Sequence, residues 1–549
     1  MGSDRPETDQ PDVLVVGAGP TGMVAALVLT ANGVSCRVVE RRTEPNESSR
    51  ALGLQARSME LLAGLGLADR IARVAYTLTG ASIMRGDDEL VRMPWVPPES
   101  AYPYTYVLPQ QGLEAILRQR LDQLEIPVDA GCELDELTQD DRSVTARLTD
   151  GRRLGARWLV GADGSRSRVR EQLGIPFTGV ATGETYYLGD TVLDPAPPIQ
   201  DSAMWLGPEG PLMLMRLPGP DHLWRIFVDV TDRARHGSVP EPTPDILERI
   251  LQSRGPTQIS ISRADWTSIF RTRVCLADQY RKGRVFLAGD AAHVFPPFGG
   301  QGMNLGIQDA FNLAWRLARV DRGAPTELLD DYQTERRPAA EATIRDVEIR
   351  RRIFALRNPL ARAGRDLLLS AASRSQGGAR RSSRQNSQLD VSYSRRRLPR
   401  PATAAPVTGD RAPDTPVGAG TIHDHIGPDH LTLIIFDPAG AQSDSNLQSH
   451  TNMPDTDLVI VRVDDGSDPD GTARAAYGMR RGGFVLVRPD GHIADLGPNP
   501  AAARDALTRF AADPKGGGEI PPGSSGISPQ FSLQSRNGAS PDCERPRCV

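Results

Sequence analysis

The stretch 283–316, which reads GRVFLAGDAAHVFPPFGGQGMNLGIQDAFNLAWR, constrains the fold of this chain more than any other. Its apolar run 285–288 predicts a buried strand that ends at a glycine and Asp290. A loop rich in proline and glycine follows, and from Met303 onward the apolar residues recur at helical spacing. A helix that begins there points its free N–H groups and its positive dipole end into the loop, which favours a negatively charged ligand. The Asp290 carboxylate can accept hydrogen bonds from a ribitol or ribose hydroxyl.

A second strand, glycine turn and helix lie near the start of the chain. The apolar run 12–16 is followed by GAGPTG and then by a helical pattern that closes at a glycine. In such a fingerprint Gly17 makes the turn, Gly19 lets the backbone approach a pyrophosphate, and Gly22 allows close packing of the helix. An ordinary turn in an α/β enzyme is the alternative interpretation.

A strand at 36–39 follows this helix and ends in Glu40, at the distance where a dinucleotide-binding fold places the acid that binds the adenosine ribose. An acid at this position favours NAD or FAD over NADP, although Arg41 and Arg42 come directly after it.

A third turn of this kind is WLVGADGSRSRVREQLG, residues 158–174, with Asp163 at the end of the strand. Three strand ends, near residues 17, 163 and 289, therefore each supply glycine and a polar group. Since no second complete fingerprint occurs, one extended dinucleotide is the economical common ligand.

Arg50 and Arg57 fit either a pyrophosphate contact or a solvated surface, and Gln110 at the start of another helix can reach the ribose or adenine.

The sequence pattern changes between residues 186 and 268. Short segments in which apolar and polar residues alternate predict an antiparallel sheet and a second domain there. Several large apolar residues of this sheet can form the wall of an apolar pocket, and a plain hydrophobic core explains each of them equally simply. With two residues of the proline-rich loop, the candidate pocket residues are Met204, Met213, Met215, Trp224, Phe227, Pro296 and Phe298.

Composition excludes several classes of function. The net charge of −5, with 64 basic residues scattered among 69 acidic ones, gives no case for a nucleic-acid partner. The chain has no apolar run of membrane-spanning length, and its first ten residues are polar, so we expect a cytoplasmic protein without a membrane partner. Five cysteines without nearby histidines predict neither a disulfide framework nor a metal site.

The motifs at 17–22, 163–170 and 288–315, together with Glu40, closely resemble those of the group A flavoprotein monooxygenases, the aromatic hydroxylases of the p-hydroxybenzoate hydroxylase type. The resemblance covers roughly residues 12–370. GDRAPD, followed by strands that end in VLVRPDGHIA, looks like the thioredoxin-like C-terminal domain of the phenol and polyketide hydroxylase branch. That segment has no CxxC, so a redox role for it has no support.

The resemblance implies an α/β fold with a Rossmann-like FAD-binding domain, an inserted antiparallel-sheet domain and the C-terminal domain. The implied boundaries are 10–180 and 280–372 for FAD, 181–279 with part of 76–108 for the substrate, 373–400 for a mobile connection, 401–512 for the thioredoxin-like domain and 513–549 for a disordered tail. Carried over position by position, the FAD contacts are Gly17, Gly19, Gly22, Glu40, Arg41, Arg50, Gln110, Asp163, Asp290, Pro297, Gly302, Met303 and Asn304. No catalytic acid or base is implied, because Pro297 and Gly302 act by positioning the reaction, and His293 is expected to be structural.

By this resemblance the enzyme takes electrons from NADPH or NADH, forms a flavin C4a-hydroperoxide with O₂, and hydroxylates a phenolic or polycyclic aromatic polyketide in antibiotic biosynthesis. A single-ring phenol hydroxylase of aromatic catabolism and a Baeyer–Villiger-type oxygenase stay open as alternatives. So does a flavin-binding redox partner without turnover. The expected oligomeric state is a monomer or a homodimer.

Overall fold

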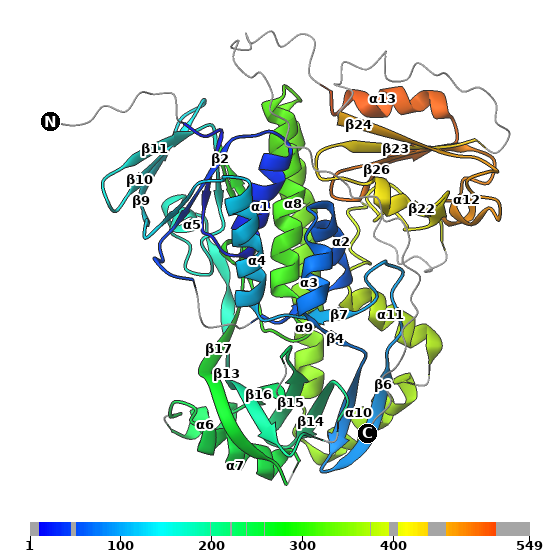
Figure 1. The fold of residues 1–549 in the computed structure, drawn as a ribbon. Helices are drawn as coiled ribbons and strands as arrows, with labels where there is room; N and C mark the ends of the chain where they lie inside the picture. Colours follow the sequence, from blue (N-terminus) through cyan, green and yellow to red (C-terminus); the bar gives the residue numbers. More distant parts are fainter. Residues whose placement is uncertain are drawn as a thin grey trace. The chain divides into compact units, whose positions relative to one another are not determined.

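The computed structural model describes residues 10–45, 51–197, 199–219, 222–237, 239–256, 258–373, 375–394, 404–437 and 457–511. These residues form a mixed α/β fold within one unit, Met1–Gly517 (Figure 1). The predicted FAD contact Arg50 and the predicted tail 513–549 lie outside the described residues.

A six-stranded sheet carries the three predicted glycine turns. Its order is β18-β19-β12-β1-β2-β8, and neighbouring strands are parallel except β18 and β19. The strands are β1 (Val13–Val16), β2 (Cys36–Glu40), β8 (Val128–Ala130), β12 (Trp158–Gly161), β18 (Arg281–Lys282) and β19 (Val285–Leu287). The predicted strands at 12–16, 36–39 and 285–288 are thereby confirmed. Because β1, β12 and β19 are parallel neighbours, their carboxyl ends, and hence the three turns, meet at one edge.

Helix α8 (Gly302–Asp321) lies along α1 (Pro20–Ala31) beside this sheet, as Figure 1 shows. The helical spacing predicts a single buried face for α8. In the structure every residue of α8 from Asn304 to Val320 is buried. The reason is tertiary, since α1 and α2 (Ala56–Gly64) pack on one side of α8 while the C-terminal part of the chain covers another.

Two small antiparallel sheets and three further helices complete this region. The first sheet has the order β11-β10-β9 and the second has the order β3-β7-β4. Their strands are β9 (Leu134–Gln139), β10 (Val144–Leu148), β11 (Arg153–Ala156), β3 (Gly53–Leu54), β4 (Tyr76–Leu78) and β7 (Thr105–Val107). The helices are α3 (Ala68–Val74), α4 (Gln110–Gln123) and α5 (Arg168–Gln172).

A large twisted sheet has the order β20-β17-β13-β16-β15-β14-β5-β6. All its pairs are antiparallel except β14 and β5. The strands are β5 (Gly80–Arg85), β6 (Asp88–Pro94), β13 (Phe177–Asp194), β14 (Ser202–Gly207), β15 (Gly210–Arg216), β16 (Leu223–Asp229), β17 (Ser260–Ala277) and β20 (His293–Val294). Helices α6 (Thr231–His236) and α7 (Pro244–Arg254) follow β16, and Leu247 and Leu251 of α7 belong to the apolar core on one face of the sheet.

Three helices come after α8, namely α9 (Asp330–Phe354), α10 (Pro359–Ser373) and α11 (Gln376–Asn386). Helix α11 lies in the stretch 373–400, where the sequence suggested only a connection. Its polar contacts reach distant parts of the chain, such as the 2.6 Å hydrogen bond from Gln385 to Asp346 of α9 and the ion pair of Arg384 with Glu99. A serine-rich and arginine-rich helix of this kind carries no apolar periodicity by which to recognise it.

The C-terminal part has a four-stranded sheet in the order β24-β23-β25-β26, of which only the β23–β24 pair is parallel. Its elements are β21 (Pro416–Val417), β22 (Gly420–Thr421), β23 (Leu431–Phe436), β24 (Leu458–Val463), α12 (Thr472–Ala476), β25 (Gly483–Val487), β26 (Ile493–Gly497) and α13 (Ala503–Thr508). Residues 404–511 are called the C-terminal unit below. Leu431 and Leu433 join the same continuous core as α8, whereas Ile434 and Phe436 face a separate core.

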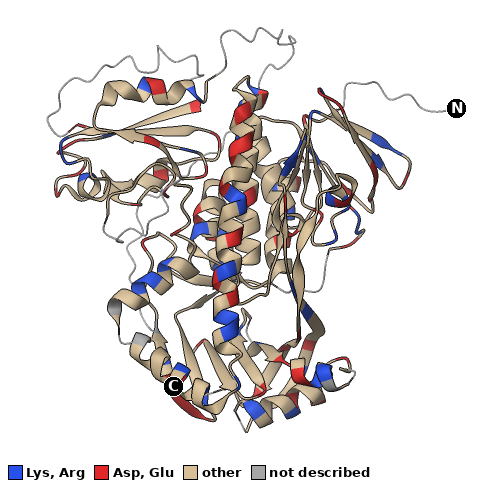
Figure 2. Ribbon diagram, turned by 180° about the vertical axis from the view of Figure 1, so that it is seen from behind, with Lys and Arg blue, Asp and Glu red and all other residues tan. Residues whose placement is uncertain are grey.

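Basic and acidic residues are interspersed along the described helices, as Figure 2 shows from the opposite side. Among the described residues, no helix combines the length and the apolar character needed to cross a membrane.

Candidate functional site

The turn after β1 holds the first three predicted ligand contacts. Gly17 has a φ of +107°, and a Cβ there would overlap the carbonyl group of Ala162 in the neighbouring turn. A Cβ on Gly22 would overlap the carbonyl oxygen of Gly17. Both positions therefore require glycine. Gly19 differs, because no atom lies within 4 Å of the place where its Cβ would stand.

Glu40 closes this turn from β2. Its Oε2 accepts a hydrogen bond of 2.8 Å from the Ala18 N–H, and its Oε1 accepts one of 3.0 Å from the Arg42 N–H. Burial by itself raises the pKa of the Glu40 carboxyl, but these hydrogen bonds and the Arg42 guanidinium outweigh it and hold the pKa below its usual value. Glu40 is therefore an anion that orients the glycine turn, while the neighbouring Arg41 is exposed.

Gln110 lies at the start of α4, as predicted, and its Nε2 donates a 2.8 Å hydrogen bond to Oε1 of Glu114. Glu114 is 1% exposed, and its other oxygen has no partner among the described residues. Burial raises the pKa of its carboxyl. Glu114 was not predicted as a site residue, although its position one helical turn after Gln110 places the two side chains on the same face of the helix.

Asp163 follows β12, and its Oδ2 accepts a hydrogen bond of 3.1 Å from the Val169 N–H. Burial raises the pKa of this carboxyl, and hydrogen bonds from Ser167 and Val169 only partly offset that effect. Arg170 ties this turn to the next one, because its Nη1 donates a 2.8 Å hydrogen bond to the carbonyl oxygen of Ala291. Asp163 and the third turn are thus held together.

The third turn begins with Gly289, at a φ of +60°, and with Asp290, whose side chain is exposed. The buried Asp309 of α8 contacts the backbone and a side chain of this turn. Its Oδ2 accepts the Gly289 N–H at 3.1 Å and lies 2.6 Å from Nε2 of His293. The expectation that His293 is structural agrees with this contact. Asp309 was not predicted as a site residue. An acid among the apolar residues of a predicted helix nevertheless indicates a buried charge that needs partners.

Asn304 was predicted to line a flavin ring. Its side chain is fully buried and fully used: Oδ1 accepts the Gln55 N–H at 2.8 Å, and Nδ2 donates to the carbonyl oxygens of Gly53 and Gly300 at 2.7 Å each. Asn304 therefore clamps the glycine loop to the strand β3. Pro297 and Met303 are partly buried on either side of this loop.

The glycines of this loop differ in the room that they leave. An added Cβ on Gly300 would be in ordinary van der Waals contact with Gln55 and Gly53, at 3.9 to 4.0 Å, whereas one on Gly302 would meet only the Phe295 ring at 4.0 Å. Gly302, like Gly19, therefore lets a ligand approach the backbone. The free N–H groups of α8 begin at Gly302, so the space lies beside partial positive charge. The residues present therefore fit an extended, anionic cofactor such as FAD.

Aromatic contacts join this loop to the large sheet. Phe298 lies edge-on to Tyr186 and Phe227, with ring centroids 6.0 and 5.9 Å apart, and the rings of Tyr186 and Phe227 stack at 4.6 Å. Met213 packs against the same cluster. Pro296, two residues before Phe298 in the loop, is buried. The structure thus brings Met213, Phe227 and Phe298 together.

The other predicted pocket residues are distributed differently. Met204 is paired across strands with Met213, so it shares the Phe227 face of the sheet, and Met215 lies two residues further along that face. Trp224 packs in the core on the opposite face. The reason is strand alternation, since Trp224 and Phe227 are three residues apart on β16.

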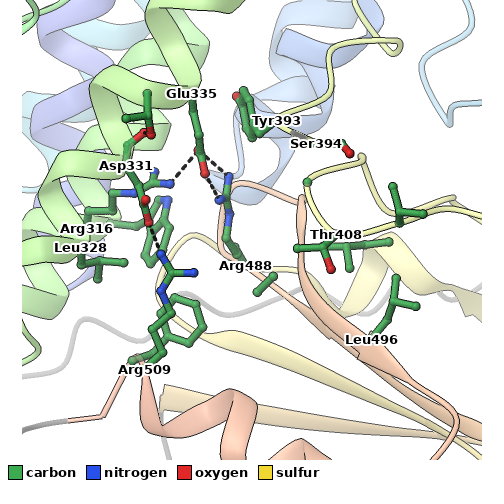
Figure 3. A pocket seen from close by; sticks show the side chains of 17 residues that line it. Arg316, Leu328, Asp331, Glu335, Tyr393, Ser394, Thr408, Arg488, Leu496 and Arg509 are labelled. Atoms are coloured by element: carbon green, nitrogen blue, oxygen red, sulfur yellow. Dashed lines mark hydrogen bonds and ion pairs between the residues drawn. The ribbon is translucent and has the colours of Figure 1, made fainter. Parts of the chain in front are cut away.

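A cavity of about 670 Å³ lies elsewhere, between α8, α9 and the C-terminal unit (Figure 3). Within it Glu335 bridges Arg316 and Arg488, and at one edge Asp331 pairs with Arg509. The residues that line this cavity come from the far part of α8, from residues 328–335 at the start of α9 and from residues 393 onward, so it is separate from the glycine loops. Arg57, considered for a pyrophosphate, also lies buried at the C-terminal unit, where it pairs with Glu60 at 3.0 Å.

The sequence matches the protein family described as "FAD binding domain" over residues 10–347. It is 36% identical over 531 residues to 6-methylpretetramide 4-monooxygenase of Streptomyces rimosus, covering 90% of this chain and 92% of that protein. The fold is similar to the solved structure of an anhydrotetracycline hydroxylase from Streptomyces rimosus, with a TM-score of 0.75, 29% identity and coverage of 92% and 100% of the two chains. A ternary complex of aklavinone-11 hydroxylase with FAD and aklavinone is similar too, with a TM-score of 0.75, 28% identity and coverage of 92% and 99%.

Proposed function

Because this chain belongs to the family of FAD-binding flavoprotein monooxygenases, as its motifs predicted, we propose that it hydroxylates a phenolic or polycyclic aromatic polyketide in antibiotic biosynthesis. Relatives that act on 6-methylpretetramide, anhydrotetracycline and aklavinone support this substrate class. The structural observation that carries the proposal is the contact between Phe298 and Phe227, which places the loop before α8 against an aromatic face of the large sheet.

FAD would be held at the carboxyl edge of the six-stranded sheet. In the proposed arrangement the first turn binds the ADP half, Asp163 lies near the pyrophosphate, and Asp290 binds the ribitol. Among the described residues, the proposed contacts are Gly17, Gly19, Gly22, Glu40, Arg41, Gln110, Asp163, Asp290, Pro297, Gly302, Met303 and Asn304, and Arg50 stays a proposed contact outside them. The open space at Gly19 and Gly302 supports this placement. Asn304 would act through its backbone and through the loop it clamps, since its side-chain groups are engaged.

When bound, FAD would supply the redox chemistry, which is to accept hydride from NADPH or NADH and to activate O₂. The protein's own contribution is position and exclusion of water. The N-terminus of α8 would stabilise negative charge beside Gly302, and the rings of Tyr186, Phe227 and Phe298 would keep the space between loop and sheet apolar. Met204, Met213 and Met215 on the same sheet face would contact the aromatic substrate.

The finer division of the fold is part of the proposal. We propose that the eight-stranded sheet is a substrate domain inserted into the FAD-binding domain, with boundaries near 181 and 279. Its long strands β13 and β17 leave and re-enter the region of the six-stranded sheet, which supports this division. The order β24-β23-β25-β26 with one parallel pair supports a thioredoxin-like C-terminal unit. The proposed oligomeric state is a monomer or a homodimer.

The test measures oxidation of NADPH and NADH by the purified yellow protein in the presence of oxygen. Single-ring phenols, hydroxynaphthoquinones and hydroxyanthraquinones are added in turn, and products are analysed by mass spectrometry. We expect a polycyclic compound to stimulate oxidation and to gain one oxygen atom. Stimulation by single-ring phenols alone would contradict the substrate class, and oxidation without oxygen transfer to any compound would contradict the hydroxylase function.

A further inference from the structure

Asp309 and Arg336 form an ion pair beneath the turn that carries Asp290. Both side chains are fully buried, and Nε of Arg336 lies 2.7 Å from Oδ1 of Asp309. The other carboxylate oxygen receives the Gly289 N–H and contacts His293. Since Gly289 and His293 flank Asp290, the position of Asp309 fixes the backbone that presents Asp290.

The remaining nitrogens of Arg336 are held by other parts of the chain. Nη2 donates to the carbonyl oxygen of Leu305 in α8 at 3.1 Å. Nη1 donates to the hydroxyl oxygen of Tyr393 at 2.8 Å. Its second contact, with Oε1 of Gln308, is longer and weaker at 3.5 Å. A buried guanidinium needs an acceptor for each of its donors, so the Tyr393 hydroxyl, together with Asp309 and Leu305, sets the orientation of Arg336.

Tyr393 in turn is fixed by the C-terminal unit. Its N–H donates to the carbonyl oxygen of Gly409 at 2.8 Å, and its ring lies against His492 with centroids 4.2 Å apart. The guanidinium of Arg488 lies over the same ring at 5.2 Å and pairs with Glu335 of α9, as Figure 3 shows. Ring and backbone of Tyr393 are thus held by the C-terminal unit. Its hydroxyl accepts the hydrogen bond from Arg336, whose guanidinium also lies 5.9 Å from the centroid of the Tyr393 ring.

We propose that Tyr393 is a positioning residue through which the C-terminal unit supports the FAD-binding turn. The order of contacts is Tyr393, Arg336, Asp309 and then Gly289, and each step is a hydrogen bond or ion pair of 3.1 Å or less. This gives the C-terminal unit a role in cofactor binding that needs no redox chemistry of its own. The inference rests on the proposed placement of FAD at the glycine turns.

The test compares two tyrosine-to-phenylalanine variants of the full-length holoenzyme. Tyr393→Phe removes the hydroxyl that Arg336 needs. Tyr477→Phe is the matched control. Tyr477 is a buried tyrosine of the C-terminal unit, whereas Tyr393 is half-buried, and it donates its hydroxyl hydrogen to the carbonyl oxygen of Pro413 at 2.7 Å, away from this chain of contacts. The measurements are the dissociation constant of FAD, the visible circular dichroism and midpoint potential of bound FAD, and the melting temperature of the apoprotein.

We expect Tyr393→Phe to weaken FAD binding about fivefold, the effect of losing one hydrogen bond, and to change the flavin circular dichroism and potential. Tyr477→Phe should leave all three flavin properties as in the wild type. Unchanged flavin properties in Tyr393→Phe, or equal changes in both variants, would overturn the inference.

A second variant covers the case in which Tyr393→Phe does not fold. Arg336→Lys keeps the charge opposite Asp309 but cannot contact Asp309, Leu305 and Tyr393 together, so it should weaken FAD binding more strongly than Tyr477→Phe. If it binds FAD like the wild type, the inference is overturned. Asp290→Ala separates the two proposals: normal FAD binding in that variant contradicts the placement of FAD, whereas weakened binding there with a normal Tyr393→Phe contradicts the coupling alone.

Discussion

The ring of Phe298, in the loop before α8, meets the ring of Phe227 on the large sheet edge to face, with centroids 5.9 Å apart. This contact connects the predicted FAD-binding loop with the face of the sheet that carries Met204 and Met213. Residues about 70 positions apart in the sequence thus share one apolar cluster.

Phe298→Ala should remove this contact. Phe298 is 7% exposed, so its truncation should lower the free energy of unfolding by about 3 kcal/mol, as for other buried phenylalanines. Water should also reach the space between loop and sheet, so more of the NADPH consumed should yield hydrogen peroxide instead of hydroxylated product. Denaturant unfolding and a peroxide assay check both effects. Phe298→Leu is the control, and equal peroxide yields in Phe298→Ala and the wild type would contradict the role in water exclusion.

Gly302→Val tests where the flavin lies. The apoprotein has room for an added Cβ at this position, because only the Phe295 ring comes as near as 4.0 Å to it. Valine is no poorer a helix former than glycine, so we expect the free energy of unfolding of the apoprotein to stay within about 1 kcal/mol of the wild type while FAD binding falls by at least tenfold. FAD titration by fluorescence measures this. Gly22→Ala gives the contrast, since overlap with Gly17 should already impair the apoprotein.

Asp290→Ala should sharply lower the FAD content of the purified protein through loss of a ribitol hydrogen bond. The Asp290 side chain is exposed, so stability of the apoprotein should change by less than about 0.5 kcal/mol. The ratio of flavin absorbance to protein absorbance reports the content. Asp290→Asn, which retains an acceptor, should bind more FAD than Asp290→Ala, and an unchanged flavin content in Asp290→Ala would remove this assignment.

Acid should destabilise the contact between α2 and the C-terminal unit, where His492 lies beside Arg57. Burial lowers the pKa of His492 to about 4, even though Asp490 beside it acts in the opposite direction and Arg57 and Arg488 add to the effect. Between that pKa and the ordinary value near 6.5, the unfolded chain binds more protons than the folded one, so stability falls as the pH drops through this window.

The measurement is urea unfolding at pH 7.5 and pH 5.0 for the wild type and for His492→Gln. In the wild type the free energy of unfolding should be lower at pH 5.0 than at pH 7.5, and in His492→Gln this difference should be smaller. The reduction is at most about 1.4 kcal/mol for each unit by which the pKa of His492 is shifted. His423, whose pKa is also lowered by burial, contributes in the same direction, and His430, whose pKa is raised by Asp429 despite burial, opposes it. An identical pH dependence in both proteins would contradict the role of His492.

Much of the fold was predictable because its signals are local. The strands before Gly17 and Asp290, the helix from Met303 and the helix from Gln110 follow from apolar periodicity and from glycines at turns. The separation of Trp224 from Phe227 was also predictable, since residues three apart on a strand face opposite sides. Helix α11 was not, because polar contacts with distant parts of the chain, among them Asp346 of α9 and Glu99, hold it in place.

The three glycine turns, the acid that follows each associated strand and, through them, the family can be recognised in the amino-acid sequence. What holds those turns in place depends on how distant parts of the chain pack together. Asp309, Arg336 and Tyr393 are 27 and 57 residues apart along the chain, and nothing in their local sequence indicates that they meet. A buried charge is stable only where partners from other elements supply its hydrogen bonds, and which partners these are depends on how α8, α9 and the C-terminal unit pack. For the same reason α8 is buried on all sides although its periodicity predicts one apolar face.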